Sequence, residues 1–282
     1  MAGGFDSQAF GLGSSSQRRI AVIIGLILTL LLVVGAADAK AAAPRRGLSD
    51  EQIVARGQLV ESGKYVEIYE HEVKVDPSFL KIMESAYGQI ETVTGLKLDT
   101  ATLGLKVRVY VSDAVGVSHV WKGYEHPSDP KAVIFLNPRV YWGSMSGKNA
   151  TYIHEMTHLF TWSFNSHTLR EGIADYVALT ILPGAAVGPN PGGSESRSEI
   201  PPEILEYLGT ARPPPGWVST DLVRRAAYYF ASYRFVNYLV EAKGMDTFMK
   251  LYASENPETA LKSLYGITRE EAVQAAFKVR PQ

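Results

Sequence analysis

The chain has 282 residues, of which 46% are hydrophobic and 20% charged, and its formal net charge at pH 7 is −1. This composition is typical of a globular protein with a sizeable core, and the near balance of charges gives no general attraction to nucleic acid, which we do not expect as a partner. The sequence contains no cysteine. Disulfides, thiolate metal sites and cysteine nucleophiles are therefore excluded, and any metal ion must be bound by histidine, aspartate or glutamate.

Residues 1–39 are predicted to be a signal peptide or an N-terminal membrane anchor. A pair of arginines precedes an apolar run over residues 20–34, and Ala37 and Ala39 then form an A-x-A-like cleavage site. The same run is about long enough to span a bilayer, so both alternatives stay open. In either case we expect the remaining chain to work outside the cytoplasm, with membrane contact only through this segment if it is not cleaved.

Residues 40–63 are predicted to be a linker with a short helix, and residues 64–282 to form one domain. Ser49 is followed three residues later by Gln52, a capping-box pattern that indicates the start of the short helix. The alternation of residues 64–75 predicts the first strand of the domain.

Further elements follow in the first half of the domain. Residues 78–94 carry apolar side chains at helical spacing and are followed by a glycine, which predicts one helix. Residues 105–112 and 131–137 are predicted to be strands. The loop between these two strands contains His119 and His126, which are less favoured candidates for a donor in the site and which we interpret as loop residues.

A pair of histidines four residues apart lies in the sequence TYIHEMTHLF. A helix predicted over residues 147–164 places His154 and His158 one turn apart on one face, where their ring nitrogens can converge on one metal ion. Glu155 is near enough to reach a water on that ion without being a ligand, as in the H-E-x-x-H motif. The alternative is two histidines that are solvated or hydrogen-bonded on a helix.

A catalytic zinc site also needs a third protein ligand. The metzincin arrangement is excluded because Phe164 occupies the position of its third histidine. His167 is a weaker candidate, interpreted as a surface loop residue. Glu171 is the stronger one, because it begins a second apolar-periodic helix whose antiparallel packing would bring it beside the histidine pair. Asp175, one turn later, can accept the other ring N–H of a liganding histidine, although acidic residues also favour a helix start for electrostatic reasons.

These motifs resemble those of the gluzincin metallopeptidases, and specifically the shorter peptidase MA-like families of exported bacterial proteins. The resemblance extends from about residue 64 to the end and rests on HEMTH, on REGIADY and on YYFASYRFVNYLVEAKG. It implies an α+β, thermolysin-like zincin fold with an N-terminal mixed β-sheet lobe that includes a helix, an active-site helix and a C-terminal helical lobe. It also implies that the strand before the active-site helix lies at the sheet edge, where an extended peptide could pair with it. The alternative is a simple core strand, which explains the hydrophobicity of residues 131–137 equally well.

The resemblance also implies roles for individual residues. The implied ligands of Zn²⁺ are His154, His158 and Glu171. Glu155 would be the general base, and Asp175 would orient a liganding histidine. The spacing between His158 and Glu171 is shorter than in thermolysin, so the substrate-pocket residues of that enzyme are not carried over.

A tyrosine of the later helical segment is the implied donor to the developing oxyanion. Tyr229 best fits the recurring tyrosine of the family. The other tyrosines of this segment are Tyr228, Tyr233 and Tyr238. The alternative is that Tyr229 and its neighbours at helical spacing form a stripe of the core.

Between the two helical segments lies a region over residues 183–221 that is rich in Pro, Gly and Ser, and it either flanks the cleft or is a tolerated insertion. Helices are then predicted over residues 224–242, 245–253, 257–265 and 268–278, with Gly244 and Gly266 as stops.

The sequence thus predicts an exported zinc metallopeptidase acting on a peptide or protein substrate. The alternative is a non-catalytic extracytoplasmic metal-binding surface protein that keeps the zincin fold. A purely structural zinc site prefers four protein ligands and has no use for Glu155, which favours the enzyme.

Overall fold

The computed structural model describes residues 48–98, 106–121, 132–161, 166–188, 200–212 and 221–277. The predicted signal peptide or anchor and His126 lie outside these ranges. The chain divides into residues 1–45 and residues 46–282, and the description below concerns the second unit. Within the described ranges, no helix is both long and apolar enough to span a bilayer.

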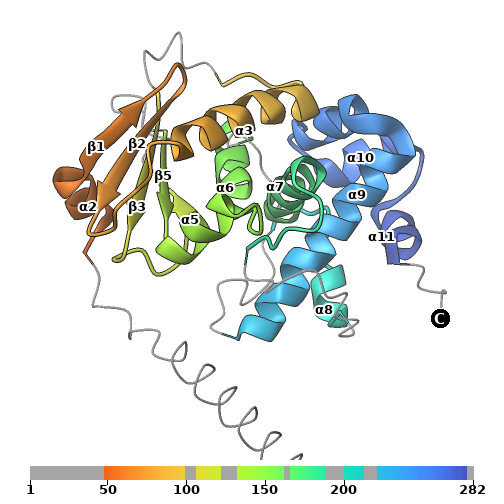
Figure 1. Ribbon diagram of the computed structural model, residues 1–282. Helices are drawn as coiled ribbons and strands as arrows, with labels where there is room; N and C mark the ends of the chain where they lie inside the picture. Colours follow the sequence, from red (N-terminus) through yellow and green to blue (C-terminus); the bar gives the residue numbers. More distant parts are fainter. Residues whose placement is uncertain are drawn as a thin grey trace, which may run out of the picture. The chain divides into compact units, whose positions relative to one another are not determined.

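The fold is α+β with a mixed sheet, as predicted (Figure 1). Its strands are β1 (Gln58–Ser62), β2 (Val66–His71), β3 (Val107–Ser112), β4 (His119–Val120) and β5 (Val133–Leu136). The order across the sheet is β1-β2-β3-β5-β4. The three central strands β2, β3 and β5 are parallel, whereas β1 and β4 pair antiparallel at the two edges.

The helices follow the predicted order, with two additions, one before the helix of the histidine pair and one in the region rich in Pro, Gly and Ser. They are α2 (Asp50–Arg56), α3 (Phe79–Thr94), α5 (Pro138–Met145), α6 (Thr151–Phe160), α7 (His167–Ile181), α8 (Pro202–Leu205), α9 (Leu222–Tyr252), α10 (Pro257–Tyr265) and α11 (Arg269–Phe277). Helix α6 packs against β4, β5 and α3, while α7 packs between α6 and α9 (Figure 1). The predicted site helices α6 and α7 are therefore central elements of the unit.

Several local signals in the sequence produce the predicted structure. The side chain of Ser49 accepts a hydrogen bond from the N–H of Gln52, and the side chain of Gln52 accepts one from the N–H of Ser49, so the capping box is formed. Helix α3 ends at Gly95, which adopts a left-handed φ of 70°. Gly244, with φ of 79°, interrupts α9 where a stop was predicted.

Other predictions from the sequence were wrong. Strands β1 and β4 and helices α5 and α8 were not predicted. Strand β1 lies in the segment interpreted as linker and short helix, and α8 lies in the region predicted to be irregular. The predicted helix over residues 147–164 is shorter, because Gly147 has a φ of 67° after α5 and α6 begins only at Thr151. The strand before this helix, β5, is not the edge strand, since β4 pairs with its outer side. His167 is not in a loop but is the first residue of α7.

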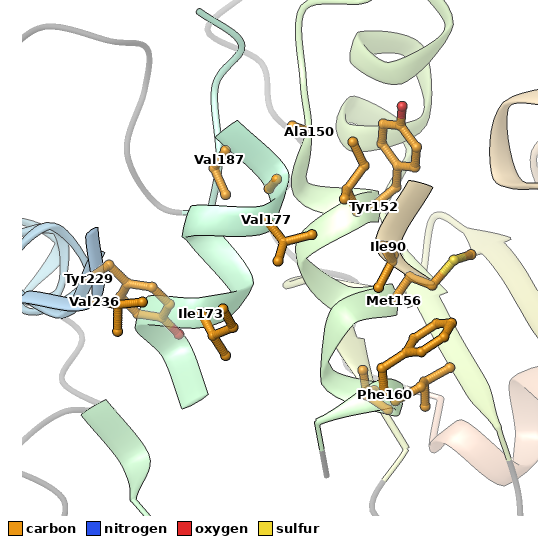
Figure 2. Close-up of a cluster of buried hydrophobic side chains, with 14 of the residues drawn as sticks. Ile90, Ala150, Tyr152, Met156, Phe160, Ile173, Val177, Val187, Tyr229 and Val236 are labelled. Atoms are coloured by element: carbon orange, nitrogen blue, oxygen red, sulfur yellow. The ribbon is translucent and has the colours of Figure 1, made fainter. Parts of the chain in front are cut away.

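The central strands β3 and β5 bury side chains on both of their faces, and the alternation of side chains explains how. In β3, Val109 and Val111 join the main core, whereas Tyr110 joins a smaller cluster on the opposite face with Ile53 of α2. The main core continues between the helices (Figure 2). Members of it drawn there from α3, α6, α7 and α9 are Ile90, Met156, Phe160, Ile173, Val177 and Val236. All ten residues of α6 are buried, so its two histidines lie in the interior of the unit.

Candidate metal centre

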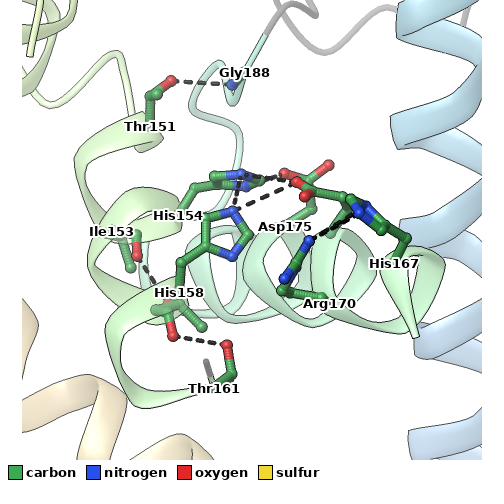
Figure 3. A network of polar contacts seen from close by, with 11 residues as sticks. Thr151, Ile153, His154, His158, Thr161, His167, Arg170, Asp175 and Gly188 are labelled. Carbon is green, nitrogen blue, oxygen red and sulfur yellow. Dashed lines mark hydrogen bonds and ion pairs between the residues drawn. The ribbon is translucent and has the colours of Figure 1, made fainter. Parts of the chain in front are cut away.

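Helix α6 presents its two histidines to the same point. The Nε2 atoms of His154 and His158 lie 3.0 Å apart, and the two rings stand at 86° to each other. Both residues are buried. The four-residue spacing thus places two ligand atoms together, as predicted (Figure 3).

Helix α7 supplies the third group. The Oε2 atom of Glu171 lies 3.4 Å from the Nε2 of His154 and 3.4 Å from the Nε2 of His158. Among the described residues, these three form a buried group that could hold a metal ion. The structure therefore brings Glu171 to the histidine pair, as the antiparallel packing of the two helices predicts.

The spacing of the three atoms fits a small cation. A tetrahedral ion with bonds of about 2.0–2.2 Å holds its ligand atoms about 3.3–3.5 Å apart, close to the separations of 3.0, 3.4 and 3.4 Å found here. The Oε2 of Glu171 is buried and has no hydrogen-bond partner. A proton shared between the two rings would leave this oxygen unsatisfied, whereas one cation would satisfy all three atoms.

Asp175 holds the ring of His154 in place. Its Oδ1 lies 2.6 Å from the Nδ1 of His154, and Figure 3 shows the two side chains facing each other between α6 and α7. Because a carboxylate accepts, Nδ1 donates, and the Nε2 of the neutral ring then carries the lone pair directed into the site. Asp175 and His154 are thus hydrogen-bonded as predicted, in the arrangement expected of a carboxylate that orients a metal ligand.

The charges around the site favour a positive ion at its centre. Burial disfavours the protonated ring of His154, but the carboxylates of Asp175, Glu171 and Glu155 together outweigh burial and raise the pKa of the ring well above its usual range. Burial likewise opposes ionisation of Glu171, yet the imidazoles of His158 and His154 hold its pKa well below the usual range. A proton or a metal ion can supply the positive charge that these groups favour.

Glu155 and Tyr229 lie in a pocket beside the ligands. This pocket has a volume of about 420 Å³, and its lining also includes His154. Both residues are buried, and the ring centroid of Tyr229 lies 5.9 Å from that of His154. Burial raises the pKa of Glu155, and burial together with the carboxylate of Glu171 raises that of Tyr229, whose hydroxyl stays protonated and can donate.

The other candidates lie outside the ligand group. The ring of His167 contacts the guanidinium of Arg170 at 3.1 Å (Figure 3). His119, in β4, places its Nε2 3.0 Å from a carboxylate oxygen of Asp50. Tyr228 is buried, and neither it nor the half-buried Tyr233 and Tyr238 line the pocket.

Part of the region rich in Pro and Gly supports the site. The hydroxyl of Ser166 caps α7 by accepting from the N–H of Leu169 and donates to the carbonyl of Thr210 at 2.6 Å. The N–H of Gly209 donates to the hydroxyl of Thr168 at 3.0 Å. Gly209 and Thr210 are therefore bound to the start of α7, just before Glu171.

Gly172 is a structural requirement of the site that the sequence did not single out. A Cβ at this position would lie 2.4 Å from the carbonyl oxygen of Ser232 in α9 and 2.5 Å from Val236. The lack of a side chain allows α7 and α9 to approach closely, which fixes the helix that carries Glu171. A glycine in the middle of a helical pattern was the available signal.

Comparison with known proteins adds no assignment. A scan against protein-family models finds no match to the chain, and a search of curated proteins finds none either. The geometry of the residues in α6, α7 and α9 therefore carries the functional argument.

Proposed function

We propose that this protein is a zinc-dependent metallopeptidase of the gluzincin type, with a thermolysin-like zincin fold. The observation that carries the proposal is the convergence of His154, His158 and Glu171 on one point, with Glu155 beside them in an open pocket. Three ligands with a free position for water and substrate are what a catalytic zinc site requires.

The chain's own residues would divide the reaction between them. Zinc held by the three ligands would act as a Lewis acid toward the peptide carbonyl and make water nucleophilic near neutral pH. Glu155 would accept the proton of the attacking water and later deliver it to the departing amine. Tyr229 would donate its hydroxyl hydrogen to the carbonyl oxygen as negative charge develops on it. Asp175 would keep His154 in the tautomer that binds metal.

An extended substrate would lie at the β4 edge of the sheet. Among the described strands, β4 pairs on one side only, with β5. The residues just before it, Gly116, Val117 and Ser118, line the pocket that contains Glu155. A peptide pairing along this edge by backbone hydrogen bonds would pass the proposed base.

We further propose that the enzyme acts outside the cytoplasm. This part of the proposal rests on the apolar run over residues 20–34 and the small residues that follow it.

The first test combines metal analysis with peptide cleavage. We expect purified wild-type protein to contain one zinc ion and to cleave members of a mixed peptide library. Glu155→Gln should keep the zinc and lose cleavage, because the amide cannot accept the proton of water. Glu203→Gln, which changes a glutamate paired with Arg224 away from the pocket, is the control and should keep both properties.

Other outcomes would contradict the proposal. One zinc ion in both proteins with no cleavage by either would favour the non-catalytic metal-binding protein. Absence of zinc from wild-type protein, even after incubation with it, would exclude the metal centre itself.

A further inference from the structure

Two arginines lie in the pocket beside the metal centre, and the proposed hydrolysis leaves both without a role. Arg225 comes from the first turn of α9, and Arg139 comes from α5, far away in the sequence. Both line the pocket that contains Glu155 and Tyr229. The pocket therefore combines proposed catalytic groups with a local excess of positive charge.

The guanidinium of Arg225 interacts with Tyr229 but leaves one of its buried N–H groups without an acceptor. Its Nε is buried and has no hydrogen-bond partner, and its Cζ lies 5.8 Å from the ring centroid of Tyr229. Within the described part of the chain, neither Arg225 nor Arg139 forms an ion pair, not even with Glu155. A buried N–H without an acceptor costs free energy, so its presence in a pocket calls for an explanation.

The neighbouring arginine shows the contrast. Arg224 forms an ion pair with Glu203 at 3.3 Å and does not line the pocket. Adjacent positions on one helix thus carry one arginine paired within the protein and one directed to the pocket. A bound carboxylate would supply the missing acceptors to Arg225, because its two oxygens match the paired N–H groups of the guanidinium.

We propose that Arg225, with the exposed Arg139 at the rim, binds a carboxylate of the substrate, so that the enzyme prefers peptides with a carboxylate close to the scissile bond. This inference rests on the proposed peptidase function. The carboxylate has two sources, an acidic side chain or the free C-terminus of the peptide, and both offer the same two oxygens to Arg225. A free C-terminus would make the enzyme a carboxypeptidase.

A binding experiment tests the proposal separately from catalysis. Three probes of similar size are compared: N-acetylglutamate α-amide, N-acetylglutamine with a free α-carboxylate, and neutral N-acetylglutamine amide. Binding to zinc-loaded, full-length Glu155→Gln protein is measured by calorimetry. We expect one of the two acids to bind about 10-fold to 100-fold more tightly than the neutral probe, and the identity of that acid distinguishes the two sources.

Substitutions in the same protein assign this preference to a residue. Arg225→Gln should bring the ratio of acid to neutral affinity close to one. Arg225→Lys, which keeps the charge but loses the fork, should give an intermediate ratio. Arg224→Gln is the matched control and should leave the ratio unchanged. Unfolding curves of all variants show whether a loss reflects misfolding, and the Lys variant keeps the test valid if the Gln variant does not fold.

Two results would overturn the proposal. Equal affinity of the three probes for the parent protein would show that the pocket does not select a carboxylate. The second result is tight binding of an acid that persists in Arg225→Gln and disappears when zinc is removed. It would show that the metal ion, and not Arg225, binds the carboxylate. The binding experiment measures no turnover, so its outcome does not depend on peptide cleavage. A failure of peptide cleavage would contradict the proposed function without deciding whether Arg225 binds a carboxylate.

Discussion

Asp175 contacts the proposed metal centre through its 2.6 Å hydrogen bond with the Nδ1 of His154. Asp175→Asn keeps an acceptor for this N–H but removes the negative charge that makes the ring more basic. We expect zinc affinity to fall about 10-fold to 100-fold, as measured by competition with a chelator. Asp246→Asn, at an exposed position of α9, is the control. Unchanged affinity of the Asp175 variant would mean that this carboxylate has no part in metal binding.

Tyr229 has two interpretations, as an oxyanion donor or as a core residue, and removal of its hydroxyl separates them. Tyr229→Phe keeps the ring beside His154 and loses only the O–H group. We expect kcat on a cleaved peptide to fall about 10²-fold to 10³-fold, because one donor to the transition state is lost. Zinc content should not change. An unaltered kcat would assign the ring to packing and require a different donor.

At the scale of elements, the contact between α7 and α9 depends on Gly172. An added Cβ would overlap the carbonyl of Ser232, so Gly172→Ala should lower the free energy of unfolding by about 1–3 kcal/mol in chemical denaturation. Gly88→Ala, in α3, is the matched control, because nothing lies within 4 Å of a Cβ there. Its expected effect is a gain of about 0.5–1 kcal/mol from helix propensity. Equal changes in both variants would contradict a tight interface.

Elements with strong periodicity could be predicted from the sequence, and elements defined by their partners could not. Helix α3 and strand β3 bury regularly spaced apolar residues, so their patterns are visible. Strand β1 is exposed or half-buried along its length and is held by pairing with β2, which leaves no hydrophobic alternation. Strand β4 has two residues, too few to show any period.

The same distinction applies to the site. His154 and His158 are neighbours through helix geometry alone, so their convergence follows from spacing. Glu171 and Asp175 needed one further assumption, the packing of two consecutive helices, which the structure confirms. Arg139 joins the pocket through a helix that was not predicted, and a sequence pattern carries no signal of such a tertiary contact.

For the whole molecule, the candidate metal centre lies between the helix packed on the sheet and the helix packed on α9. Helix α6 packs on β4 and β5 and carries two ligands, whereas α7 packs on α9 and carries the third. Tyr252, in the last turn of α9, adds a 2.9 Å hydrogen bond to the carbonyl of Thr161, just after α6. An ion bound by residues of both helices should therefore stabilise the whole folded unit against unfolding.

Thermal unfolding measures this coupling. Zinc at about 100 times its Kd stabilises a native state that alone binds it by about 2.7 kcal/mol, which for a unit of this size corresponds to a Tm increase of about 5–10 °C. We expect this increase for wild-type protein on adding zinc after treatment with a chelator. Glu155→Gln should show the same increase, because Glu155 is not a ligand. Glu171→Gln should lose most of it, since the carboxylate that joins α7 to the ion is gone. An equal increase in Glu171→Gln and wild type would mean that zinc stabilises the protein from another position, and the proposed centre would be wrong.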